Sequence, residues 1–99
     1  MISWIRKFVE QRQTARRRWE ADARKLVSAD PVDAYYHAQR LAARCRCAGE
    51  TDEFGHWSKV AAEVARIEPL AEMNYAKVKA INDREKARHK QHQYRASRY

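Results

Sequence analysis

Residues with catalytic potential are few, and none has the spacing of a known reaction centre. The chain contains two cysteines, four histidines and four serines. No nucleophile elbow, kinase, zinc-protease or phosphate-loop motif connects them. Cys47 could be paired with His37 or His56, but a packed thiol on an alanine-rich helix accounts for it more simply. We therefore predict that the protein is not an enzyme and uses no cofactor.

A metal site would have to be assembled from scattered ligands, namely His37, Cys45, Cys47 and His56. Structural zinc sites favour cysteines two to four residues apart on a turn, together with a second matched pair. Here the two cysteines lie on an expected helix, and no second pair follows. His89 and His92 could hold a metal weakly if they lie on a helix, but their occurrence in a polar segment is better explained by chance. We predict no metal site.

The cysteines and the hydropathy of the chain predict its compartment. Cys45 and Cys47 would point to different faces of a helix, which makes a disulfide between them difficult. Reduced thiols are typical of a cytoplasmic protein. The chain has no apolar run of the roughly 20 residues that span a bilayer, and no signal-peptide pattern. We therefore expect a cytoplasmic location.

The charge of the chain is concentrated at its two ends. Lysine and arginine number 21 against 13 acidic residues, which gives a formal net charge of +8. Residues 1–30 have a net charge of +4, residues 31–69 of −1 and residues 70–99 of +5. Basic ends attract polyanions such as nucleic acid, anionic lipid or an acidic protein surface.

Nucleic-acid binding is one function that these ends predict. Arginine and lysine contact phosphates, and the interleaved aromatic residues Trp19, Tyr94 and Tyr99 could stack on unpaired bases. No helix-turn-helix, zinc-finger or RNA-recognition motif is present, so this function is the alternative interpretation. Its candidate residues are Arg16, Arg17, Arg18, Arg84, Lys86, Arg88, Lys90, Arg95 and Arg98.

An apolar stripe near the start of the chain predicts a different kind of surface. At 100° per residue, the apolar residues of 2–27 share an arc of about 140°. This helix is longer than its neighbours can cover, so the first part of its stripe needs a partner, a second copy or the fourth helix against it. The predicted partner-binding residues are Trp4, Ile5, Phe8, Val9 and Arg12. A third interpretation places this stripe in an anionic membrane surface.

Two arginines interrupt the apolar arc of residues 2–27. Arg12 and Arg16 project between Val9 and Trp19 on the helical projection. Their stems would pack while their charged ends reach water, or they would stack on Trp19 or pair with an acid such as Glu63. In a functional interpretation they meet an acidic group of the partner.

Residues that typically start or end helices divide the rest of the chain into further helices. Asp30 is a suitable N-cap before Pro31, which opens an alanine-rich helix over about 31–47, of the kind usually wedged between two neighbours. That helix has one clearly polar stripe: Asp33, His37, Arg40 and Arg44. Gly49 ends it, and Asp52 caps a third helix over about 53–67.

A fourth helix is expected to restart at Glu68-Pro69, with one apolar arc formed by Leu70, Met73, Val78 and Ile81. Beyond Ile81 the chain has no aliphatic residue larger than alanine and nothing evident to bury. We therefore predict a helical domain over residues 1–81 and a basic tail over 82–99, either a solvated helical extension or disordered. The fold class is all-α: a small three- to four-helix bundle with a long N-terminal amphipathic helix.

The middle of the chain resembles short, uncharacterised helical proteins of proteobacteria. The resemblance covers residues 33–66 and rests on two segments, DAYYHAQR at 33–40 and HWSKVAAEVAR at 56–66. The same region is similar to one tetratricopeptide-type helical hairpin, although a single hairpin is not an array. Both resemblances imply a helical hairpin in a bacterial or phage setting, and neither implies an activity.

These observations favour a non-enzymatic, basic helical protein that binds other proteins. The leading hypothesis is an adaptor, regulator or inhibitor that self-associates or docks on a larger, acidic partner. Nucleic-acid binding through the basic ends is the alternative. Peripheral association with an anionic membrane surface is the third.

Overall fold

The described part of the chain forms four helices joined by short connections. The computed structural model describes residues 2–97, and these residues contain no strand. The helices are α1 (Ile2–Ala29), α2 (Ala34–Cys47), α3 (Thr51–Ile67) and α4 (Tyr75–Ser97). The predicted all-α bundle with a long first helix is therefore confirmed.

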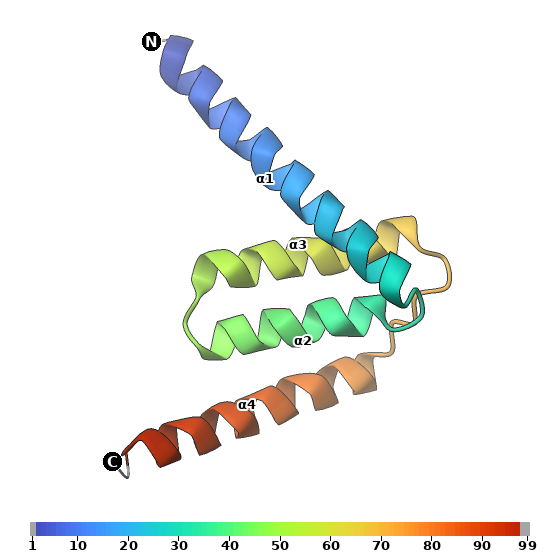
Figure 1. Ribbon diagram of the computed structural model, residues 1–99, viewed down its shortest axis with the longest axis vertical. Helices are drawn as coiled ribbons and strands as arrows, with labels where there is room; N and C mark the ends of the chain where they lie inside the picture. The colour runs from blue at the N-terminus through green and yellow to red at the C-terminus, as the bar shows by residue number, and fades with distance from the viewer. Residues whose placement is uncertain (1, 98–99) are drawn as a thin grey trace.

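Helix α2 lies at the centre of the arrangement. It packs against α3 on one side and α4 on the other, and α1 crosses α3 and also contacts α2 (Figure 1). Within residues 2–97, α1 and α4 make no contact with each other. The radius of gyration of 16.2 Å exceeds the roughly 13 Å of a spherical domain of this length. This is because the N-terminal half of α1 and the C-terminal part of α4 project from the shared core (Figure 1).

Small side chains dominate the core. Its buried members are Ala23, Ala34, Ala38, Val60, Ala61, Val64 and Ala71. The largest fully buried side chains are Val60 and Val64. Larger residues are only partly buried around this cluster: Trp19, Leu26, Val27, Tyr35, Trp57 and Ile67. Because alanine fills little space, the helices approach one another closely, as predicted for α2 wedged between two neighbours.

Local capping explains the first two connections. The carboxylate of Asp30 accepts hydrogen bonds from the backbone N–H groups of Val32 and Asp33, each at 3.2 Å, and so stabilises a turn over residues 31–33. The predicted helix start at Pro31 with Asp30 as N-cap is therefore wrong, because α2 begins at Ala34 and Asp33 occupies the N-cap position. Gly49 follows α2 with φ 75°, a left-handed conformation that glycine adopts without steric cost. The third helix begins at Thr51, slightly before the position expected from Asp52.

The start of the fourth helix differs from the prediction. The chain does not resume a helix at Pro69; residues 68–74 form a turn and an extended link, and α4 begins at Tyr75. The backbone N–H of Asn74 donates to the hydroxyl of buried Tyr36 at 2.8 Å, while the Asn74 side chain accepts from the N–H of Ala76 at 2.8 Å. Consequently Leu70 and Met73 are exposed in the link and do not share an arc with Ile81.

Helix α4 continues without a break through the boundary predicted at residue 81. The expectation that nothing beyond Ile81 is buried is wrong, because Glu85 is only 5% exposed. Its carboxylate receives two hydrogen bonds from Arg44, from Nε at 3.2 Å and from Nη2 at 3.1 Å. An ion pair, and not an aliphatic side chain, attaches this part of α4 to α2. The chain is helical up to Ser97, so the alternative of a disordered tail does not apply to residues 82–97.

Candidate functional site

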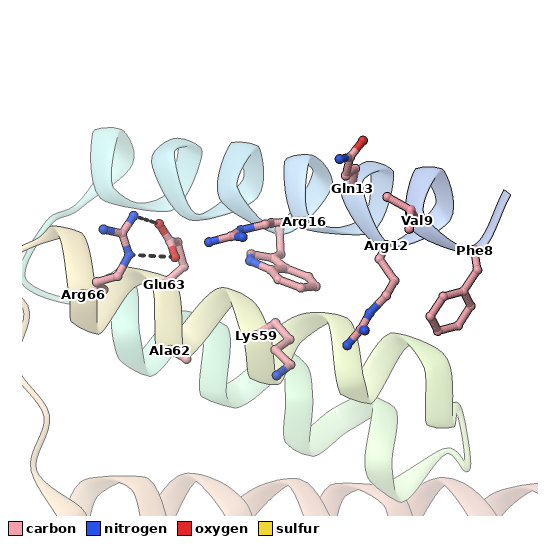
Figure 2. Close-up of a pocket in the computed structure, with 10 residues that line it drawn as sticks. Phe8, Val9, Arg12, Gln13, Arg16, Lys59, Ala62, Glu63 and Arg66 are labelled. Carbon is pink, nitrogen blue, oxygen red and sulfur yellow. Dashed lines mark hydrogen bonds and ion pairs between the residues drawn. The ribbon is translucent and has the colours of Figure 1, made fainter. Parts of the chain in front are cut away.

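A groove lies between the N-terminal half of α1 and the exposed side of α3. We call it the α1–α3 groove; it has a volume of about 560 Å³ and is lined by Phe8, Val9, Arg12, Gln13, Arg16, Trp19, Lys59, Ala62, Glu63 and Arg66. It forms because α1 leaves α3 towards its N-terminus, so that no other helix covers this part of α1 (Figures 1 and 2).

The groove has an apolar lining bordered by cations. Phe8 and Val9 are 52% and 44% exposed, and Trp19 is half-buried beside them. The Arg12 guanidinium lies 5.4 Å from the centre of the Phe8 ring, and Lys59 Nζ lies 5.8 Å from the centre of the Trp19 ring. These cation–π contacts hold two positive charges beside the aromatic surfaces. Figure 2 shows Arg12 and Phe8 on the same side of α1.

Glu63 is the only carboxylate that lines the groove, and it already has a partner. Arg66 donates to it through Nε at 3.1 Å and through Nη2 in a second, shorter contact (Figure 2). These hydrogen bonds hold the pKa of Glu63 below its ordinary value, so it remains ionised. The groove therefore carries one neutralised acid beside Arg12 and Lys59, and beside Arg16, which is paired with Glu20 of the same helix.

The predicted partner-binding residues fall partly on this groove. Phe8, Val9 and Arg12 line it, whereas Trp4 and Ile5 lie nearer the N-terminus, outside its lining. Trp4 and Ile5 are exposed like the rest of the stripe, and α4 does not cover them. Arg12 adopts neither of the paired arrangements considered for it, since its guanidinium lies over Phe8 and not over Trp19.

The basic residues predicted for nucleic-acid binding do not form one surface. Arg16 lines the groove and binds Glu20 at 3.1 Å, and Arg18 binds Glu53 at 2.9 Å. Arg17 is exposed on α1. The basic residues of α4 belong to a helix that does not contact α1. The structure therefore does not bring the two ends of the chain together.

Helix α4 itself separates its cations into two edges. At 100° per residue, Arg84, Arg88 and Arg95 share an arc of about 40°. Lys86 and Lys90 lie on the opposite edge, together with Lys79. All of these residues are exposed on α4. Arg98 lies outside the described residues.

Among the histidines and cysteines singled out from the sequence, His56 and Cys45 lie in surroundings that give them structural roles. His56 is buried, and its Nε2 lies 2.7 Å from the Asp22 carboxylate, which joins α3 to α1. Burial raises the pKa of the Cys45 thiol, which disfavours a nucleophilic thiolate. Between residues 2 and 97, no three histidine, cysteine or acidic side chains are grouped as metal ligands would be.

Sequence reasoning missed the α3 side of the groove. Lys59, Ala62 and Arg66 were not among the predicted site residues, although their spacing of three, four and seven puts them on one face of α3. That face adjoins the apolar arc containing Val60 and Val64, so helical periodicity could have identified it. That this face of α3 lies opposite the α1 stripe depends on how the two helices cross, which the sequence of neither helix shows.

Comparison of the chain with models of protein families, with curated proteins and with solved structures finds no match. In the described part of the chain, no helix combines the length and the apolar character needed to cross a membrane.

Proposed function

We propose that the protein is a non-enzymatic docking protein whose α1–α3 groove binds an acidic, amphipathic helix of a partner protein. The observation that carries this proposal is the composition of the groove: an apolar lining bordered by cations, with one carboxylate that Arg66 already binds. Apolar side chains of the partner would fill the lining, and its carboxylates would meet Arg12, Arg16 and Lys59.

The shape and lining of the groove support a helical partner. Its aromatic and aliphatic residues on α1 are the adjacent Phe8 and Val9 and, about three turns further along, Trp19. A helix that presents apolar residues at i, i+3, i+4 and i+7 offers a matching row of anchors. The groove is open along its length, which suits a segment of chain better than a small molecule enclosed on all sides.

Charge favours an acidic partner over a second copy of this protein. The exposed residues 3–18 of α1 include six cations, Arg6, Lys7, Arg12, Arg16, Arg17 and Arg18, against the single acid Glu10. If the same segment of another copy entered the groove, basic residues would face basic residues. Such like-charge contacts are unfavourable at an interface.

A defined peptide tests the proposal. The probe is a labelled helical peptide of roughly 20 residues, with leucines at i, i+3, i+4 and i+7 spacing and glutamates beside them. Binding is followed by fluorescence anisotropy. The unmodified protein should bind this peptide and should not bind the same peptide with lysine in place of glutamate. Equal binding of both peptides, or of neither, would contradict the proposal.

Two matched pairs of variants locate the binding surface. Phe8→Ala should weaken binding of the acidic peptide about tenfold, because it removes an apolar anchor. Trp4→Ala removes another exposed aromatic residue of α1 that lies outside the groove and should have little effect. Arg12→Glu should likewise weaken binding about tenfold. Arg17→Glu makes the same change of charge outside the groove and should not weaken binding. Equal losses of affinity within either pair of variants would place the binding surface elsewhere.

A further inference from the structure

A second cationic surface lies on the other side of α2, where α4 packs against it. We call it the arginine ridge and define it by five residues: Arg40 and Arg44 of α2, and Arg84, Arg88 and Arg95 of α4. Arg40 and Arg84 line one hollow of about 250 Å³ together with Asp33, Tyr36 and Lys77. Arg44 and Arg88 both contact the carboxylate of Glu85, at 3.1 and 3.7 Å.

Glu85 organises the ridge without neutralising it. The carboxylate is 5% exposed and lies under Arg44 and Arg88, and Arg40 also acts on its charge. Hydrogen bonding from Arg44 holds the pKa of Glu85 below its ordinary value, so one fixed negative charge faces three guanidinium groups. Arg44 uses two of its five N–H donors on Glu85, through Nε and Nη2. Its other donors remain available, and its side chain is 46% exposed.

The spacing of the ridge suits an extended row of phosphates. Arg84, Arg88 and Arg95 follow one edge of α4 over a rise of about 17 Å at 1.5 Å per residue. The phosphates of each strand of a duplex recur every 3.4 Å along the duplex axis, so this length corresponds to about five base-pair steps where α4 lies along that axis. Arginine binds phosphate through a planar fork of two N–H groups, which lysine does not offer.

The large apolar side chains beside the ridge are buried, since Tyr36 and Ile81, which line the hollow, are 4% and 8% exposed. The exposed large hydrophobic residues of α4 are Tyr75 and Tyr94. On the helical projection they lie roughly 160° and 100° away from Arg95. The ridge therefore lacks both the apolar anchors of a protein interface and the aromatic platform that unpaired bases use. It also lacks the apolar residues that insert into a membrane surface.

We infer that the arginine ridge binds the phosphate backbone of a nucleic-acid duplex, without reading its sequence. This surface differs from the pooled basic ends expected from the sequence, because it adds Arg40 and Arg44 of α2 and leaves out Arg16, Arg17, Arg18, Lys86 and Lys90. It is separate from the α1–α3 groove, so its success or failure is independent of the proposed docking function. DNA and RNA duplexes share this phosphate chemistry.

Two variants with the same net charge test the inference. Arg84, Arg88 and Arg95 are all changed to Gln in the ridge variant. Lys79, Lys86 and Lys90 are all changed to Gln in the control variant. Both lose three exposed positive charges from the same helix, on opposite edges. The probes are blunt duplexes of DNA and of RNA of random sequence, measured by fluorescence anisotropy in 100 mM salt, with helicity checked by circular dichroism.

The ridge variant should bind duplex of the order of 100-fold more weakly, because three phosphate contacts are lost. The control variant should change affinity less than about threefold, since charges more than a Debye length of ~10 Å away are screened. Binding of one duplex and not the other would confirm the phosphate contact and identify its source. Equal losses in both variants, or no duplex binding by the unmodified protein, would overturn the inference.

A second set of variants and two competing ligands serve as further controls. If the ridge variant loses helicity, Arg84→Gln with Arg95→Gln replaces it, compared with Lys79→Gln with Lys90→Gln; neither pair removes a partner of Glu85. Tighter binding to a single strand of equal length would overturn the duplex assignment. So would tighter binding to vesicles of phosphatidylserine and phosphatidylcholine, which would indicate a membrane as the partner.

Discussion

The α1–α3 groove and the arginine ridge are both basic, but they hold their cations in different ways. In the groove, Arg12 and Lys59 lie over aromatic rings, so positive charge and apolar surface are presented together. On the ridge, Arg44 and Arg88 are fixed by the buried carboxylate of Glu85, with no exposed apolar side chain between them. The first arrangement requires a partner with shape as well as charge, and the second requires only a row of negative charges.

The largest predicted difference between the two surfaces is their response to salt. Five phosphate contacts give a slope of about −4.5 in log affinity against log salt, so duplex binding should weaken roughly 500-fold between 50 and 200 mM salt. Binding of the acidic peptide in the groove should weaken less than about tenfold, because apolar burial is little affected by salt over this range. Titrations of both ligands at several salt concentrations measure this. Parallel salt dependences would remove the distinction between the surfaces.

Replacement of Glu85 should lower the stability of the fold at the ridge without changing binding in the α1–α3 groove. Glu85→Gln keeps the shape of the side chain but removes the charge that Arg44 and Arg88 bind. We expect the free energy of unfolding to fall by about 2 kcal/mol, the usual range for hydrogen bonds to charged groups. Denaturant unfolding measures this loss, and Glu72→Gln serves as control because the Glu72–Lys77 pair is exposed. Peptide affinity in the groove should not change, since α1 and α4 are not in contact.

The smallest predicted effect is a weakening of the fold in acid. The pKa values of Glu63 and Glu85 are both below their ordinary value of 4.5 in the folded protein. A lowered pKa contributes stability that is present above the unfolded value and is lost as the pH falls through the folded value. The free energy of unfolding should therefore decline below about pH 4.5. Glu85→Gln should show a shallower decline than the unmodified protein; an identical decline would mean that Glu85 does not contribute.

Helical periodicity predicted much of the fold because it is a local property of the chain. The four helical segments, the turn after Asp30 and the apolar face of α3 all follow from residues within one or two turns of each other. The start of α4 was predicted wrongly at Pro69, because the helix begins after Asn74, whose side chain accepts hydrogen bonds from the backbone N–H groups of Ala76 and Lys77. This cap is local and was overlooked, whereas the bond from the Asn74 N–H to Tyr36, 38 residues earlier, gives no local sign in the sequence.

The candidate surfaces show the same division between local and distant information. The exposed stripe on α1 was predictable, since it is longer than the core that could cover it. Its pairing with Lys59 and Arg66 was not, because the crossing of two helices is not encoded in either one alone. The burial of Glu85 depends on Arg44, 41 residues away, and a charged residue in a basic segment gives no local sign of it.

The projection of α1 beyond α3 also has a mechanical consequence. The last side-chain contacts between the two helices are at Arg18 and Asp22, so the rest of α1 is a rigid lever attached at one end. Phe8 lies about 15 Å from Arg18 along the helix axis, so a bend of 5° at Arg18 moves it by about 1.3 Å. Because α1 is one continuous helix with Ala23 buried in the core, such a movement requires the helix to bend and not to tilt as a whole. A bend of this size would let the groove accept apolar side chains of different sizes, while its cations still select an acidic helix.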